Sequence, residues 1–177
     1  MKVYLDNSVV SAIPKDDTAK ESPALRQVHR LFKDGKLDLW TSKVSEGEIA
    51  KYEDEGRRKL VEDFYNLLKD VAYFDVDQLL YIAHAWDPYG GQISSPVFDP
   101  TTSIQSLLSI RLDQTDSHHL MVAIRAQCDV FLTCDRRILC RESLIREQFS
   151  IRVMSPSELI EELGDAPGFS LGSRGAL

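Results

Sequence analysis

The sequence has few cysteines and no long hydrophobic run. Cysteine occurs three times, at positions 128, 134 and 140, without a CxxC pair or a histidine at metal spacing. This excludes a disulfide framework and a thiolate zinc site, so we expect reduced packing residues. No apolar run approaches the ~20 residues of a membrane-spanning helix. The opening MKVYLDNSVV turns polar too early for a secretory signal. We therefore expect a soluble, cytoplasmic protein with no membrane partner.

Positive charge and phosphate-binding glycine loops are also scarce. The 28 acidic residues outnumber the 21 lysines and arginines, which gives a formal net charge of −7. A large positively charged surface that binds nucleic acid is therefore not expected, although local basic clusters remain. The patterns GxGxxG and GxxxxGK[ST] do not occur, so a nucleotide-cradling loop is not supported.

What is present predicts one α/β domain. The chain has 177 residues, of which 43% are hydrophobic, enough for a core. Short β-prone runs alternate with segments of helical periodicity, which favours a parallel sheet covered on both faces. The predicted strands are 2–5, 37–41, 71–76, 130–133 and 151–154. We expect a three-layer α/β/α sandwich of about five strands over residues 1–163. Residues 87–113 would form a long loop or insertion, and residues 164–177 a flexible tail.

Two helix starts and one helix break are predicted from capping chemistry. Ser45 with Glu48, and Ser155 with Glu158, have the spacing of a capping box. Gly56 is expected to divide the long charged helical region in which it lies.

Four acids follow predicted strands or lie near the starts of predicted helices: Asp6, Glu48, Asp116 and Asp135. Because ligand sites form at the carboxyl ends of parallel strands, we expect these acids to lie together at that edge of the sheet. Each has an ordinary alternative role as a helix cap or capping-box member. Four carboxylates at one edge would repel one another, and without a cation some would bind protons. Oxygen ligands without His or Cys favour Mg²⁺ or Mn²⁺, which suits phosphodiester hydrolysis.

Three segments resemble the PIN-domain ribonuclease family. VYLDNSVVSAI is similar to its first strand and turn, and SKVSEGEI to its second acidic motif. DSHHLMVAIRAQCDVFLTCDRRIL is the most specific match, with its two acids 19 positions apart (135 − 116). The ending RVMSPSELIEEL resembles the last strand and helix of the family. The likeness covers the chain to about residue 163, with a gap in the middle.

The resemblance implies a metal-dependent endoribonuclease, often the toxin of a VapBC-type toxin–antitoxin pair. Such members commonly dimerise and are held inactive by a small antitoxin. The four acids match the metal-binding quartet of the family. Asn7 and Ser8 match the polar pair after the first acid, and Thr133 the hydroxyl residue before the last.

Several residues near the four acids have two alternative roles. Asp113 lies one helical turn from Asp116 and Glu46 precedes Glu48, so either could replace its neighbour. His119 could contact substrate or simply pack. Arg136 and Arg137 directly follow the last acid; they could hold an RNA phosphate or lie on a solvated face.

The main alternative function is a catalytically silent PIN-like domain that binds RNA or a protein. An aspartyl-phosphate phosphatase is disfavoured, because the acid it needs two residues after Asp6 is replaced by Ser8.

Overall fold

The computed structural model describes residues 1–11, 21–67, 72–74, 107 and 109–165. The strands are β1 (Lys2–Leu5), β2 (Asp38–Ser42), β3 (Ala72–Phe74), β4 (Val130–Leu132) and β5 (Arg152–Met154). The helices used below are α1 (Asn7–Ser11), α2 (Glu21–Lys33), α3 (Lys43–Ile49), α4 (Glu55–Leu67), α7 (Gln114–Arg125), α8 (Arg136–Leu139), α9 (Glu142–Phe149) and α10 (Pro156–Asp165).

The five strands form one parallel sheet in the order β3-β2-β1-β4-β5. In the register, Val3 of β1 lies between Leu39 of β2 and Val130 of β4. The chain begins at the centre of the sheet and extends first to one side and then to the other, as right-handed crossovers allow. The predicted parallel sheet of about five strands is confirmed.

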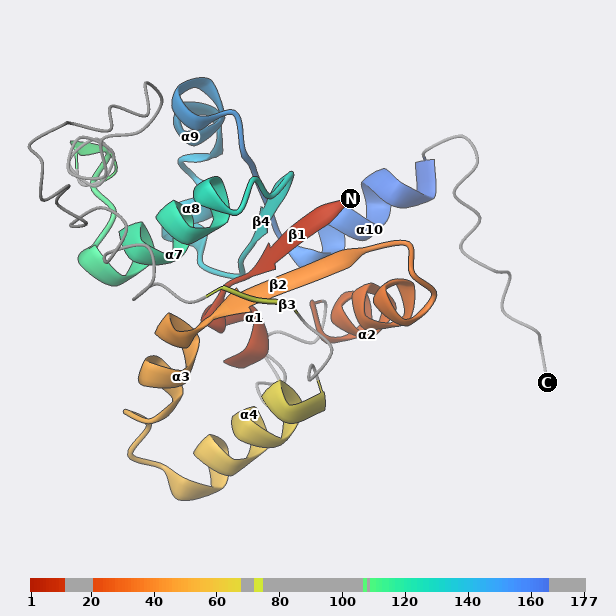
Figure 1. Ribbon diagram of the computed structural model, residues 1–177, viewed down its shortest axis with the longest axis vertical. Coiled ribbons are helices and arrows are strands. Elements are labelled where there is room, and N and C mark those ends of the chain that lie inside the picture. Colours follow the sequence, from red (N-terminus) through yellow and green to blue (C-terminus); the bar gives the residue numbers. More distant parts are fainter. Residues whose placement is uncertain (12–20, 68–71, 75–106, 108, 166–177) are drawn as a thin grey trace, which may run out of the picture.

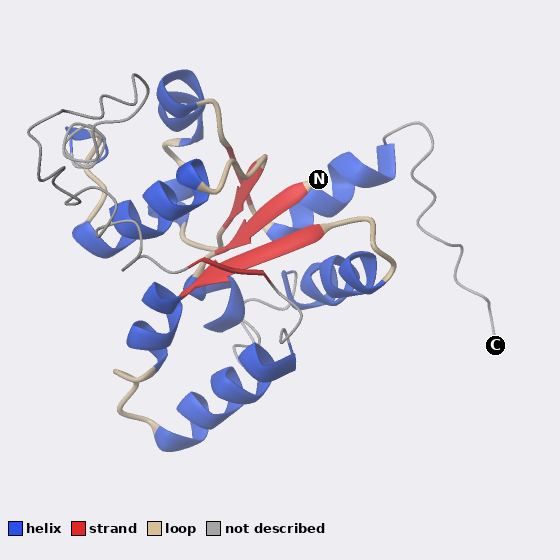
Figure 2. Ribbon diagram, in the orientation of Figure 1, coloured by secondary structure: helices blue, strands red, loops and turns tan. Residues whose placement is uncertain are grey.

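Helices cover both faces of this sheet, as Figures 1 and 2 show. Alternation along β1 sends Val3 and Leu5 to one face, where they pack with α2 and α10. Tyr4 points to the other face, where it packs with residues of α7, α8 and α9. Two apolar layers therefore enclose the sheet, and its neighbouring strands β1 and β4 are buried on both sides, as is usual in parallel sheets.

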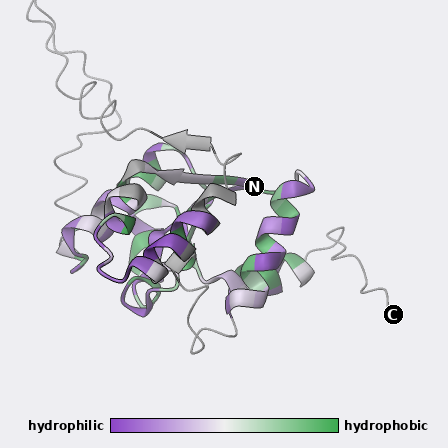
Figure 3. Cartoon of the chain, turned by 90° about the horizontal axis from the view of Figure 1, so that it is seen from below, coloured by the Kyte–Doolittle hydropathy of each residue, from purple (hydrophilic) through white to green (hydrophobic). Residues whose placement is uncertain are grey.

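The helices are amphipathic, with one buried and one solvent-facing side. In α2, Leu25, Val28 and Leu31 are buried at helical spacing, whereas Arg26 and Arg30 are exposed. Hydrophilic and hydrophobic residues accordingly alternate along the helices in Figure 3. Burial of these stripes, rather than intrinsic helix propensity, stabilises the short helices of this domain.

The capping predictions have different outcomes. Ser155 and Glu158 form the predicted capping box, with Ser155 N donating to Glu158 Oε2 at 2.7 Å and Glu158 N donating to Ser155 Oγ at 3.3 Å. The prediction for Ser45 is wrong: α3 already begins at Lys43, so Ser45 lies within the helix and its hydroxyl contacts Thr41 Oγ1 at 3.2 Å. Gly56 does not divide the helical region either, since it lies in the first turn of α4. The break falls at residues 50–54.

Most of the predicted 87–113 insertion lies outside the described residues. The predicted tail does too, except for residues 164 and 165, which end α10. Within the part of the chain that the structure describes, no helix is long and apolar enough to cross a membrane.

Candidate functional site

The carboxyl ends of β1 and β4 place two of the predicted acids at one edge of the sheet. Asp6 follows β1 directly, and Asp135 follows β4 by three residues. The two strands are neighbours and parallel, and Asp6 N donates to Leu132 O at 3.0 Å. This hydrogen bond holds Asp6 beside the end of β4, the strand that leads to Asp135.

Two hydroxyl groups hold the carboxylate of Asp6, which is 4% exposed. Ser8 Oγ and Thr133 Oγ1 both donate to Asp6 Oδ2, at 2.5 and 2.8 Å. The same hydroxyls accept the backbone N–H groups of Cys134 (2.9 Å) and Asp135 (3.0 Å). Both donations fall on Oδ2, so Oδ1 takes no part in this network. Ser8 and Thr133, which the resemblance assigned to the site, thus orient Asp6.

Asp135 is held by its own helix. It is the N-cap of α8, where its Oδ1 accepts the backbone N–H of Arg137 at 2.7 Å. The guanidinium of Arg137 also donates to both carboxylate oxygens, with Nη2–Oδ2 at 2.6 Å and Nε–Oδ1 at 3.1 Å. These hydrogen bonds hold the pKa of Asp135 below its usual range. The helix-cap role and a role in the acidic site are therefore compatible in one residue.

The structure separates the roles of Asp113 and Asp116. Asp113 is the N-cap of α7, and its side chain accepts the backbone N–H of Asp116 at 2.9 Å. Its side chain is 51% exposed, whereas that of Asp116 is only 16% exposed. The Arg137 guanidinium lies 3.6 Å from a carboxylate oxygen of each. Asp113 is thus a cap at the rim, and Asp116 is the inner acid.

Asp116 carries an unfavourable negative charge. Burial, followed by the neighbouring charges of Asp113, Asp6 and Asp135, raises its pKa to about 7, although Arg137 acts in the opposite direction. Three of the four predicted acids therefore lie close enough to repel one another. The positive charge of Arg137 is shared among Asp113, Asp116 and Asp135, and this pairing raises its own pKa further above its ordinary value.

Glu48 joins this edge through a buried histidine. Its Oε2 lies 2.8 Å from His119 Nε2, and the Nδ1 of the same ring lies 2.8 Å from Tyr4 Oη. Tyr4 Oη in turn lies 2.6 Å from Ser42 Oγ. His119 is 1% exposed, so its ring contacts Glu48 rather than solvent. The side chain of Glu46, the weaker alternative, lies outside what the structure describes.

The remaining predicted residues lie around this edge. Asn7 is buried and its Nδ2 donates to Tyr52 Oη at 3.2 Å, while its Oδ1 is buried and has no hydrogen-bond partner among the described residues. Arg136 is exposed on α8. Sequence reasoning did not identify Tyr4 and Ser42 as partners of His119. The alternation along β1 was a usable signal, because it sends Tyr4 to the face on which α7 packs.

The donor chemistry of this edge fits a hard divalent cation, since it consists of carboxylates without His or Cys ligands. The mutual repulsion that raises the pKa of Asp116 points the same way. The acids are, however, spread around the Arg137 guanidinium. Within the described residues, no three His, Cys, Asp or Glu side chains lie close enough together to bind one metal ion in their present positions. A cation would therefore require the acids to close around it and Arg137 to move.

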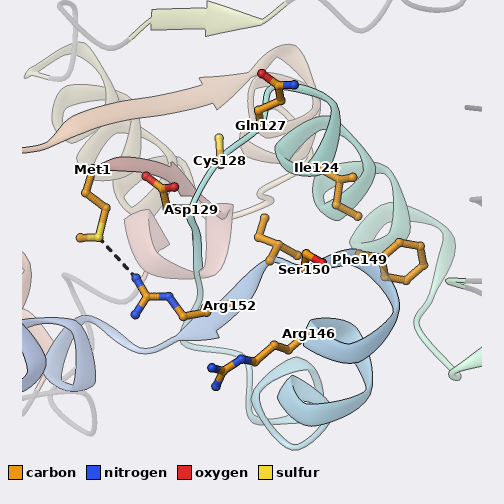
Figure 4. A pocket seen from close by; sticks show the side chains of 10 residues that line it. Met1, Ile124, Gln127, Cys128, Asp129, Arg146, Phe149, Ser150 and Arg152 are labelled. Atoms are coloured by element: carbon orange, nitrogen blue, oxygen red, sulfur yellow. Dashed lines mark hydrogen bonds between the residues drawn. The ribbon is translucent and has the colours of Figure 1, made fainter. Parts of the chain in front are cut away.

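A hollow of about 730 Å³ lies at the opposite, amino edge of the sheet (Figure 4). It is lined by residues that precede or begin β1, β4 and β5, including Met1, Asp129 and Arg152. Arg152 is already engaged there, with Glu162 Oε1 at 2.5 Å and Met1 Sδ at 3.5 Å. This hollow and the acidic edge are thus separate features of the molecule.

Comparison with known proteins supports the fold class. No family model matches the sequence, and neither does any curated protein. A chain in the crystal structure of VapBC2 from Rickettsia felis, bound to a DNA fragment from their promoter, is similar in structure, with a TM-score of 0.53 and 9% sequence identity. The similarity covers 88% of this chain and 98% of that chain. The fold is a PIN-like three-layer α/β/α sandwich.

Proposed function

We propose that the chain is a metal-dependent endoribonuclease. Its site consists of Asp6, Glu48, Asp116 and Asp135, and its cofactor is Mg²⁺ or Mn²⁺. The observation that carries the proposal is the convergence of Asp6, Asp116 and Asp135 at one sheet edge. Among the described residues, the guanidinium of Arg137 is the positive group that pairs with these acids. A divalent cation would offset the repulsion that raises the pKa of Asp116.

The chain's own residues prepare the site in distinct ways. Ser8 and Thr133 fix Asp6 through hydrogen bonds to Oδ2. The start of α8 fixes Asp135, and His119 holds Glu48. When bound, the cation would activate a water molecule and offset charge on the phosphodiester as it reacts. We propose that Arg137, with a side chain that is 65% exposed, and the exposed Arg136 contact a phosphate of RNA.

The biological setting that we propose is a toxin–antitoxin pair. The structural likeness to a chain of a VapBC complex supports a small antitoxin protein as partner, and homodimerisation is proposed with it. A second candidate is a silent PIN-like domain that binds RNA or a protein without cleaving it. The spread of the acids around Arg137 favours this candidate, because a guanidinium already neutralises part of their charge.

Cleavage of RNA in the presence of Mg²⁺ or Mn²⁺ tests the proposal. We expect wild-type protein to cut RNA, and Asp6→Asn and Asp116→Asn to remove cutting while the fold, followed by circular dichroism, is kept. Asp34→Asn provides a matched control, since Asp34 is exposed at the end of α2. Undiminished cutting by both site variants would reject the quartet. RNA binding without cleavage by the wild type would establish the silent module instead.

A further inference from the structure

We propose that His119 is a positioning residue that fixes the carboxylate of Glu48 for the divalent cation, and that it is itself fixed by Tyr4 and Ser42. This inference rests on the proposed function, because it assigns Glu48 to a cation site. It adds a role for three residues that are not themselves ligands.

The hydrogen-bond chain has a defined direction. An ionised Glu48 only accepts hydrogen bonds, so His119 Nε2, 2.8 Å from Oε2, carries a proton. In the neutral imidazole the other nitrogen, Nδ1, is then an acceptor, and the Tyr4 hydroxyl donates a hydrogen bond to it at 2.8 Å. Tyr4 Oη can in turn accept from Ser42 Oγ at 2.6 Å. With the proton on Nε2, each of these three hydrogen bonds has one donor and one acceptor.

The anchor of this chain is rigid because it lies in the core. Tyr4 is fully buried on the central strand β1 and stacks on Phe131 of β4, with ring centroids 5.5 Å apart. Its ring also meets that of His119 edge-on at 5.9 Å. His119 belongs to α7, the helix that carries Asp116 in its first turn. The sheet, through Tyr4, and α7 together therefore fix the position of His119 Nε2, the nitrogen that contacts Glu48.

Glu48 needs such an anchor more than the other acids do. It has one more rotatable bond than an aspartate, and fixing a glutamate side chain costs up to ~2 kcal/mol of rotamer entropy. It lies in the last turn of the seven-residue α3, between exposed Gly47 and buried Ile49, and its side chain is 29% exposed. The partners of ligating groups commonly change metal affinity by ~10- to 100-fold when they are removed.

The inference is tested by the Mn²⁺ affinity of the full chain. Isothermal titration and the Mn²⁺-induced rise in melting temperature both measure it. We expect His119→Leu to weaken Mn²⁺ binding by about 10-fold or more. His119→Gln should stay close to wild type, because a glutamine amide offers one donor and one acceptor at nearly the spacing of the two ring nitrogens. Tyr4→Phe, which removes only the hydroxyl, should give a smaller loss, and it replaces His119→Leu if that variant does not fold. His118→Ala is the matched control.

A double-mutant cycle with Glu48→Gln separates positioning from a general structural effect. If His119 acts through Glu48, His119→Leu should add little to the loss already caused by Glu48→Gln. A loss that persists undiminished in the Glu48→Gln background would overturn the inference, as would equal losses in His119→Leu and His119→Gln. These results leave the proposed function intact if wild-type protein binds Mn²⁺ and cleaves RNA. Absence of Mn²⁺ binding by the wild type would reject the proposed function and this inference with it.

Discussion

Asp116→Asn should stabilise the protein in the absence of metal, and this effect should depend on pH. The carboxyl of Asp116 has its pKa raised from 3.8 to about 7 in the folded chain. Between those two values the unfolded chain releases the proton while the folded chain keeps it. The stability of the wild type therefore falls as pH rises from about 4 to about 7, and the full penalty remains above pH 7. Asparagine has no such proton to lose.

The magnitude follows from the pKa shift. A change from 3.8 to about 7 corresponds to ~4 kcal/mol if the whole shift acts on folding. Water screens part of the repulsion at this partly exposed site, so we expect ~1–2 kcal/mol. For a domain of this size each kcal/mol changes the melting temperature by ~2–4 °C. Asp116→Asn should thus melt ~2–8 °C higher than wild type at pH 8 in the presence of EDTA.

Thermal unfolding followed by circular dichroism at pH 4, 5, 6, 7 and 8 measures the difference. It should grow between pH 4 and 7 and then stay constant, while Asp34→Asn should show no such trend. Saturating Mn²⁺ should reverse the order, since the cation stabilises the wild type by binding the folded state. A variant that melts below wild type at pH 8 in EDTA would refute the electrostatic reasoning, and so would a difference that does not change with pH.

Two further predictions concern other residues. Arg137→Ala should strengthen Mn²⁺ binding by up to about fivefold, because a surface ion pair worth ~0–1 kcal/mol no longer competes for Asp135. Isothermal titration measures the Mn²⁺ affinity, and Arg136→Ala, which removes an exposed charge from the same helix, is the control. Weaker Mn²⁺ binding by Arg137→Ala would contradict the prediction. Cys128 should resist thiol reagents at pH 8, because burial raises the pKa of its thiol to about 12, whereas the exposed Cys140 should react. Mass spectrometry after timed alkylation would contradict this if Cys128 were labelled as fast as Cys140.

The sheet could be predicted because its signals are local. Each strand is a short β-prone run that ends in polar or capping residues, as Leu5 is followed by Asp6 and Asn7. Parallel pairing then follows from the helices between the runs. The gathering of Asp6 and Asp135 at one edge needs only that rule. The break before α4 was misplaced because a glycine is tolerated in the first turn of a helix, where Gly56 lies.

The contacts of the acids could not be predicted in the same way, because they depend on distant partners. His119 and Glu48 are 71 residues apart, and Tyr4 and His119 are 115 apart. Periodicity assigns Tyr4 and His119 to facing surfaces, but hydrogen bonding depends on the register between β1 and α7. For Arg137 the sequence left a phosphate contact and a solvated face as alternatives. Its pairing with Asp135 depends on the rotamer of one exposed side chain.

The four acids differ in how their negative charge is compensated, and this difference indicates where a cation would have most effect. Asp6 receives two hydroxyl hydrogen bonds, Asp135 receives a helix N–H and a guanidinium fork, and Glu48 receives His119 Nε2. Asp116 has Arg137 at 3.6 Å as its counter-charge, and burial together with the neighbouring acids raises its pKa. Charge that the fold leaves uncompensated at Asp116 is available to a bound cation. The inner acid of α7 should therefore contribute most of the metal-dependent stabilisation, while the other acids fix the geometry.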